Sequence, residues 1–171
     1  SAVALDENDQ PVSFILPRDR QGLELLDDFD AMGQRLTASG TTHLHDVQVL
    51  ASEIRTRTVE EGKRTIVTPF LQVFLAAVQA GIARNALNDA VTFAKEHARP
   101  IKHSSATRSV DDPYVELSVG DVSARAFTAE AVVLHAADSI DRAWAADLDA
   151  VAVDQAAVDV AQAQYIAAES A

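Results

Sequence analysis

The chain has 171 residues, of which 48% are hydrophobic and 23% are charged, a composition typical of a folded globular protein. Asp and Glu outnumber Lys and Arg by 26 to 14, which gives a formal net charge of −12 and disfavours binding to nucleic acid or to an anionic membrane. The absence of cysteine excludes disulfides, thiolate nucleophiles and cysteine-ligated metals.

Neither end of the chain has the features of a targeting segment. We find no uninterrupted apolar run of the roughly 18 residues that a membrane helix needs and no basic start or long apolar centre of a signal peptide. We therefore expect a cytoplasmic protein without a membrane partner. The chain opens inside a strand-like alternation and ends inside a helical pattern, so we also expect it to be part of a longer protein.

Residues 1–52 show the short apolar alternation of β-strands. Turn residues interrupt it at intervals of about 8 to 12 residues, as in an antiparallel meander or small barrel. The expected strands are "SAVALDE", "VSFILP" and "LELLDDF", separated by "NDQP" and "RDRQG". A further strand is expected where His43, His45, Val47 and Val49 alternate, preceded by the small polar residues of 34–42.

Residues 53–67 form a charged connector, and from Thr68 the apolar period changes to 3.6. Thr68 is expected to cap the first helix with Pro69 at its first position, and Pro100 should end that helix near Arg99. A second helix should begin at Pro113.

Asp112 is expected to cap this second helix, and a third helix should start near Leu148. The second helix carries two apolar stripes, one of them formed by Leu117, Ala124, Phe127, Ala131 and Leu134, so it should have neighbours on two sides. The sequence thus predicts an α+β protein with β structure in 1–52 and an incomplete four-helix-type bundle in 68–171.

Two segments carry candidate chemistry. His43 and His45 share one strand face beside Asp46 and fit either a metal site or exposed strand-end histidines; no third ligand recurs at a suitable spacing. The segment "HARPIKHSSATRSVDDP" is the basic, hydroxyl-rich patch of an acidic chain. It fits either phosphate binding or a solvated turn whose cations complement the dipole of the preceding helix.

Several motifs in order resemble flavin-dependent members of the acyl-CoA dehydrogenase superfamily. "GQRLTASGTT", "ARP" and "DDPY", with the helix "FLQVFLAAVQAGIARNALNDAVTFAKEHARP", are similar to the branch of dibenzothiophene monooxygenases and sulfur-acquisition oxidoreductases. The resemblance implies part of an antiparallel β-barrel middle domain followed by most of the helical bundle that forms a homotetramer. It also implies catalytic residues outside this chain, so the 171 residues alone should be inactive.

The resemblance assigns roles to particular residues. Arg99 of "ARP" matches the arginine that holds the flavin phosphate, and Thr37 and Ser39 lie on a thin polar strand expected to face the flavin. Phe70 and Phe74 are expected to line the substrate pocket, although the residues alone indicate most simply that they form a core cluster with Phe93. No residue is assigned to catalysis or to a metal.

The implied activity is that of a two-component monooxygenase. It would take reduced FMN from a flavin reductase and use O2 to oxygenate a sulfur-containing or aromatic small molecule. His97 stands where the acyl-CoA dehydrogenases carry an arginine, and the Phe-Gly that follows there is missing, which favours FMN as a diffusing co-substrate over tightly held FAD. An FAD-dependent acyl-CoA dehydrogenase and a non-catalytic oligomerisation module remain the alternatives.

Overall fold

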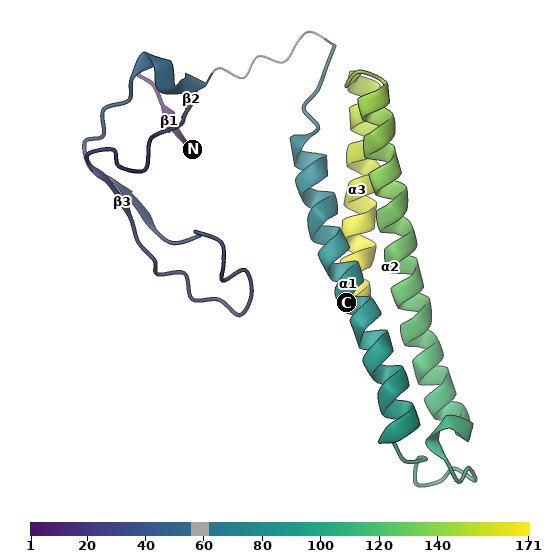
Figure 1. Ribbon diagram of the computed structural model, residues 1–171. Helices are drawn as coiled ribbons and strands as arrows, with labels where there is room; N and C mark the ends of the chain where they lie inside the picture. The colour runs from purple at the N-terminus through teal and green to yellow at the C-terminus, as the bar shows by residue number, and fades with distance from the viewer. Residues whose placement is uncertain (56–61) are drawn as a thin grey trace. The chain divides into compact units, whose positions relative to one another are not determined.

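The computed structural model describes residues 1–55 and 62–171, and it contains two compact units, Ser1–Thr58 and Val59–Ala171 (Figure 1). Short strands supply the regular structure of the first unit, and three long helices supply that of the second. The predicted α+β class is therefore confirmed. Residues 56–61, in the middle of the predicted connector 53–67, lie outside the described residues.

The strands of the first unit pair into two small antiparallel sheets. The three-stranded sheet has the order β1-β2-β5, formed by β1 (Ala2–Leu5), β2 (Pro11–Phe14) and β5 (Ile54–Arg55). The other sheet pairs β3 (Leu23–Leu25) with β4 (Thr42–Leu44). A short 3-10 helix, η1 (Ala51–Glu53), precedes β5, which falls in the segment predicted as a connector. The described strands do not close into a barrel.

Local hydrogen bonds explain the tight turn after β1. The Asp6 carboxylate accepts hydrogen bonds from the backbone N–H groups of Asn8 at 2.8 Å and Gln10 at 2.9 Å. These bonds, that of Gln10 first, hold the pKa of Asp6 below its usual range. The turn that "NDQP" predicts is therefore confirmed, and it brings β2 back beside β1 with Val3 opposite Ser13.

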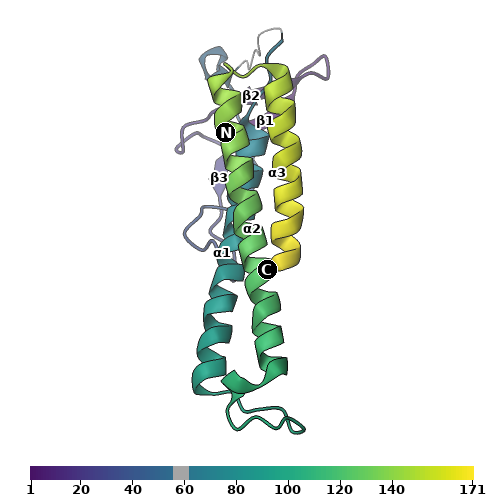
Figure 2. The ribbon, with the colours of Figure 1, turned by 90° about the vertical axis from the view of Figure 1, so that its right-hand side faces the viewer.

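The second unit is a bundle of α1 (Val67–Glu96), α2 (Pro113–Ala145) and α3 (Ala150–Ser170), with a 3-10 helix, η2 (Ser109–Asp111), just before α2. Each helix packs against the other two (Figures 1 and 2). Asp112 caps α2 with Pro113 at its first position, as predicted. The predicted Thr68 cap is wrong, because α1 already begins at Val67 after a buried Ile66 that has no side-chain cap.

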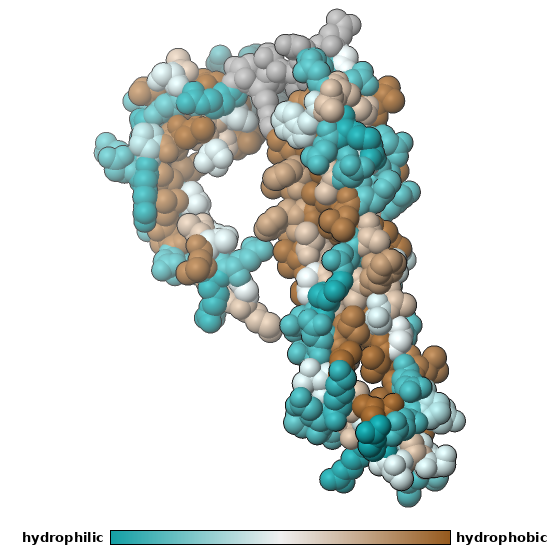
Figure 3. Space-filling view, turned by 45° about the vertical axis from the view of Figure 1, so that its right-hand side comes forward, coloured by the Kyte–Doolittle hydropathy of each residue, from teal (hydrophilic) through white to brown (hydrophobic). Residues whose placement is uncertain are grey.

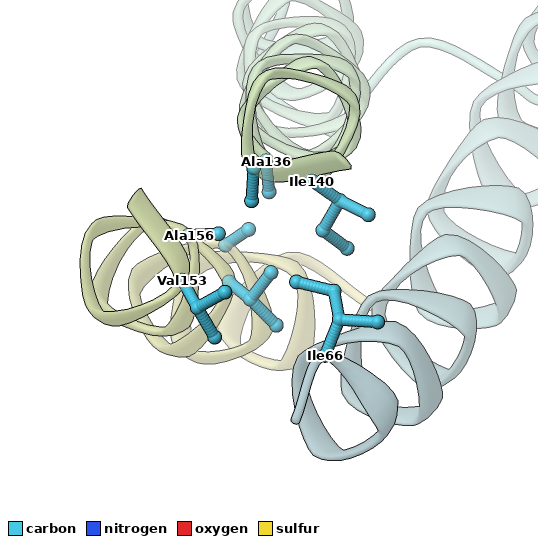
Figure 4. Packing of buried hydrophobic residues seen from close by; sticks show 8 residues of the cluster. Ile66, Ala136, Ile140, Val153 and Ala156 are labelled. Carbon is cyan, nitrogen blue, oxygen red and sulfur yellow. The ribbon is translucent and has the colours of Figure 1, made fainter. Parts of the chain in front are cut away.

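Small side chains form most of the bundle core. Ala76 of α1, Ala136 of α2 and Ala156 of α3 are fully buried, and Val160 and Ile66 pack in the same core cluster as Ala136 and Ala156. Figure 4 shows Ile66, Ile140 and Val153 converging on the alanines of α2 and α3. Because alanine projects little from the helix, the three backbones can approach closely along this seam.

Large apolar side chains of the same helices lie on the surface. The second predicted stripe of α2 is exposed, with Leu117 at 72%, Phe127 at 71% and Leu134 at 64%. Figure 3 shows hydrophobic residues over much of the visible face of the helical unit. α1 and α3 both pack on α2, but no described element covers this second stripe, and the three described helices do not complete a four-helix bundle.

Among the described residues, α1 is the one helix that is long and apolar enough, by length and composition alone, to cross a membrane. Its 18-residue window has a mean hydropathy of 1.3, and 22% of that window is buried. The core helix of a bundle meets the same criterion, so this property by itself assigns no membrane to the chain.

A buried polar cluster links α2 to α3. Asp159 of α3 is 9% exposed; its carboxylate accepts a hydrogen bond from the Ser139 hydroxyl of α2 and another from the Gln155 amide at 2.9 Å. His135 Nε2 lies 3.7 Å from the same carboxylate. The Ser139 hydrogen bond is the main cause that lowers the pKa of Asp159, and burial opposes it.

We expect Asp159→Ala to lower the free energy of unfolding of the helical unit by roughly 1 to 3 kcal/mol, because the buried Ser139 hydroxyl loses its acceptor. The folded pKa of Asp159 lies below its ordinary value of 3.8, so its ionised form stabilises the fold above that pH. The difference between wild type and variant should therefore shrink as the pH falls below 3.8. Urea unfolding between neutral and acidic pH measures this.

Asp154→Ala is the matched control on α3. Asp154 pairs with Arg64 at 2.9 Å, and both side chains are 60% exposed, so the loss should stay below about 1 kcal/mol. Equal losses for the two variants would contradict a special role for Asp159.

Candidate functional site

The loop between α1 and α2, residues 97–112, carries two cations without a carboxylate partner. Arg99 and Lys102 are exposed, and neither forms an ion pair within the described parts of the chain. The loop also presents the hydroxyl side chains of Ser105 and Thr107, whereas the Ser104 hydroxyl is engaged with Asp112 and Ala106 N. Exposed guanidinium and ammonium groups beside hydroxyl donors can bind an anion such as phosphate.

Arg108 of the same loop is already engaged. Its Nε donates to Asp111 Oδ2 at 2.7 Å and its Nη2 donates to Oδ1 at 2.9 Å, a two-point ion pair. The Asp111 hydrogen bonds raise the pKa of Arg108, and the same contacts lower the pKa of Asp111. Arg99 and Lys102 are therefore the cations that can meet an external anion without breaking a contact within the loop.

Two buried side chains hold this loop on the helices. Ser109, 5% exposed, donates its hydroxyl hydrogen bond to the Ala94 carbonyl near the end of α1. Asp112 is fully buried; its Oδ1 accepts from Tyr114 N at 3.0 Å and its Oδ2 accepts from Ile101 N at 2.8 Å. The backbone that carries Arg99 and Lys102 is thus tied to the start of α2.

The pKa of Asp112 reflects opposing effects. Burial alone raises the pKa, but hydrogen bonds from the N–H groups of Ile101 and Tyr114, and a further bond with the Ser104 side chain, outweigh it and lower the net pKa. The carboxylate is therefore ionised at neutral pH, which allows both of its oxygens to act as acceptors.

Thr37 and Ser39 lie in an irregular loop, and the predicted strand through Thr37, Ser39 and Gly40 is wrong because β4 begins only at Thr42. The Thr37 hydroxyl donates to the Gln34 carbonyl at 2.7 Å and lies 2.7 Å from the Ser39 hydroxyl. These local bonds compete with strand formation. The second half of the predicted strand is also shorter than expected, since β4 stops at Leu44 and Asp46 has a φ of 48°.

Position 40 requires glycine because two backbone segments come close together there. A Cβ at this position would lie 1.9 Å from the Leu26 carbonyl oxygen, and Asp28 accepts a hydrogen bond from Thr41 N at 2.7 Å. The loop closes one side of a groove of about 580 Å³ within the first unit, lined by Gly40, Thr41 and Thr42 together with leucines such as Leu16 and Leu23. Neither Thr37 nor Ser39 lines this groove.

Phe70 and Phe74 lie on α1 and are 57% and 60% exposed. Phe93 is 59% exposed and packs near His97, with ring centroids 6.0 Å apart. The alternative interpretation of these aromatics as core is therefore wrong for this chain. The structure does not bring Phe74 to Arg99, since α1 separates them by on the order of 30 Å at its rise of about 1.5 Å per residue.

The histidine pair of the first unit has close local partners. The His43 and His45 rings stack with centroids 5.7 Å apart, and His45 Nε2 lies 3.6 Å from a Glu24 carboxylate oxygen. Within the described residues, no group of three His, Cys, Asp or Glu side chains has a geometry that could hold a metal ion.

A second groove was not foreseen from the sequence. It measures about 700 Å³ and lies between the last turns of α1 and the first turns of α2, next to the basic loop. Leu87, Val91, Val115, Val119 and Gly120 are among its lining residues. On each helix the sequence does show apolar residues four apart, which share one helix face. Only the packing of α1 against α2 shows that these two faces line the same groove.

Residues 73–171 match the family model described as acyl-CoA dehydrogenase, C-terminal domain. The chain belongs to this family. Among its curated relatives, a dibenzothiophene monooxygenase of Mycolicibacterium goodii is 32% identical over 140 residues, 78% of this chain and 34% of the relative. A probable FMNH2-dependent monooxygenase of Pseudomonas putida is 31% identical over 137 residues, 76% of this chain and 33% of the relative.

The fold is also similar to a solved structure of a dibenzothiophene monooxygenase from Paenibacillus sp. A11-2 in complex with FMN and indole. The TM-score is 0.81 at 28% identity, covering 99% of this chain and 46% of that one. The resemblance predicted from the motifs is therefore confirmed. The chain spans about a third of the length of the curated relatives it matches.

Proposed function

We propose that the complete gene product is a two-component flavin-dependent monooxygenase of the cytoplasm. It takes reduced FMN from a flavin reductase and uses O2 to oxygenate a sulfur-containing or aromatic small molecule. The similarity to relatives named as dibenzothiophene and FMNH2-dependent monooxygenases carries this proposal. These relatives support it over an acyl-CoA dehydrogenase that binds FAD and over a non-catalytic helical module.

The residues of the interhelical loop fit a flavin phosphate. Arg99 and Lys102 are exposed cations without a carboxylate partner in the described residues, whereas most of this acidic chain would repel an anion. When bound, reduced flavin supplies the electrons that activate O2. The contribution of this chain is to bind the phosphate through Arg99 and to offer the aromatic side chains Phe70 and Phe74 as apolar walls that exclude water. Thr37 and Ser39 remain candidates for polar contacts to the flavin.

We expect Arg99→Ala in the complete gene product to raise the dissociation constant of reduced FMN about ten- to a hundredfold, since a charge-assisted contact contributes about 1.5 to 3 kcal/mol. The loss should shrink as the salt concentration rises, because screening already weakens the wild-type contact. Anaerobic fluorescence titration measures the constant. Arg108→Ala is the control and should change it less than threefold or so, because Asp111 already occupies that guanidinium. A flavin-binding defect confined to Arg108→Ala would refute this assignment.

We further propose the finer architecture that the resemblance implies: a β-barrel middle domain that includes 1–52, a connector at 53–67, and a four-helix-type bundle that includes 68–171. We also propose a homotetramer. The length of α1 supports it, because Phe74 and Arg99 lie further apart than the length of an FMN molecule. If Phe74 and Arg99 both line flavin-containing sites, those sites are different, and an oligomer in which each site is shared between copies would accommodate this.

The exposed stripe of α2 suits pairing with another copy. Its members follow alternating spacings of three and four residues, as in a coiled coil: Leu117, Gly120, Ala124, Phe127, Ala131 and Leu134. In an antiparallel pair, Leu117 of one copy can lie opposite Leu134 of the other, which places Ala124 opposite Phe127. The small residues leave room for the large ones, so the stripe is complementary to itself.

We expect Phe127→Glu to weaken self-association of the complete gene product by at least about a hundredfold, because each interface would lose two buried phenyl rings and gain two charges. Analytical ultracentrifugation over a concentration series measures this. Tyr165→Glu is the matched control, since Tyr165 is an aromatic residue of α3 with a similar exposure of 68%, and it should leave association unchanged. If the Phe127→Glu variant sediments like the wild type, this face is not the interface.

A further inference from the structure

Asp112 stands at the junction of the basic loop and α2, and its two carboxylate oxygens serve different elements. Oδ1 accepts from Tyr114 N at 3.0 Å and caps α2, while Oδ2 accepts from Ile101 N at 2.8 Å. We propose that Asp112 is a positioning residue that holds the segment of Arg99 and Lys102 in the conformation that binds the flavin phosphate. This inference rests on the proposed function.

Ile101 is the position through which the loop can be held. It lies two residues after Arg99 and directly before Lys102, so fixing its backbone fixes the origin of both side chains. Within residues 99–103, Ile101 is the one residue whose backbone N–H donates a hydrogen bond to another described residue, and its acceptor is Asp112. The Ile101 carbonyl also accepts from Ser104 N at 2.9 Å, and the Ser104 side chain bonds Asp112. The segment is therefore tied to α2 through this one carboxylate.

A carboxylate is the group that this position requires. Serine and asparagine also cap helices, but each offers a single acceptor atom of the geometry needed to bond Tyr114 N. Neither can then accept from Ile101 N as well. Full burial of Asp112 excludes water as a substitute acceptor without local opening. Loss of the second oxygen should thus release the loop while the helix cap persists.

α3 offers a matched cap without the second contact. Asp149 accepts from Val151 N at 3.0 Å and from Ala152 N at 3.3 Å through the same oxygen, and it is exposed. Its side chain forms no hydrogen bond to a residue outside the start of α3 within the described residues. A comparison of Asp112→Ser with Asp149→Ser therefore separates positioning of the loop from capping of a helix.

The experiment compares these two variants in the complete gene product. We expect the lost cap to lower the melting temperature of each by about 2 to 4 °C, and Asp112→Ser to lower it further because the Ile101 N–H also loses its buried acceptor. Asp112→Ser should in addition raise the dissociation constant of reduced FMN about three- to tenfold, the effect of one hydrogen bond. Asp149→Ser should leave FMN binding unchanged. If the serine variant does not fold, Asp112→Asn takes its place in the experiment. It keeps the side-chain volume and the helix cap, and it should weaken FMN binding by the same factor.

The triple variant Arg99→Ala/Lys102→Ala/Asp112→Ser tests the route of the effect. If Asp112 acts through Arg99 and Lys102, the triple variant should bind FMN about as weakly as Arg99→Ala/Lys102→Ala. Additive losses would overturn the positioning role, and so would equal FMN binding by Asp112→Ser and Asp149→Ser.

Limited trypsin digestion gives a readout that does not depend on flavin. Cleavage after Lys102 should accelerate in Asp112→Ser and not in Asp149→Ser. Failure of wild type to bind FMN would overturn the proposed function, whereas equal cleavage of the two variants would overturn the anchoring by Asp112. The two failures are therefore distinguishable.

Discussion

Close packing of three helices through alanine is the constraint on which the helical unit depends. Ala76, Ala129 and Ala167 meet where the three helices come together, and all are fully buried. Helices packed this closely leave little room between them for large side chains. Phe74 and Phe127, on the same helices, therefore project outward. The pattern that closes the bundle therefore also leaves aromatic surface for contacts with a ligand or another chain.

Charge pairing determines which cations of the helical unit are available. Arg84 pairs with Glu130, Arg125 with Asp121, and Arg142 with Asp138, all across helix surfaces. Together with the Arg108–Asp111 pair, these contacts occupy most of the arginines of the helical unit with carboxylates of the same unit. Arg99 and Lys102 differ because the buried carboxylate of their loop, Asp112, already accepts hydrogen bonds from backbone N–H groups. An anion can therefore approach them without competition from that carboxylate.

The sequence predicted local features well and context-dependent ones poorly. Asp112 before Pro113 predicts the start of α2 because capping and the geometry of proline act within one turn. Thr68 failed as a cap because burial of Ile66 in the core, a long-range contact, begins α1 earlier. Thr37 failed as a strand residue because its hydroxyl bonds locally instead. Only the structure shows that Arg108 is paired with a carboxylate and Arg99 is not, since the two are the same type of residue in the same loop.

The rigidity of α1 connects the proposed flavin binding with the proposed assembly. A continuous helix holds its two ends at a fixed separation of about 1.5 Å per residue, so Phe74 and Arg99 cannot approach each other by bending. The seam of alanines along α1 and α2 reinforces this, because packed interiors resist compression. A flavin that lies near one end of α1 is therefore out of reach of the other end. If the aromatic face and the basic loop both serve flavin, the association of chains determines which copies share each site, and the bundle sets the distance between sites.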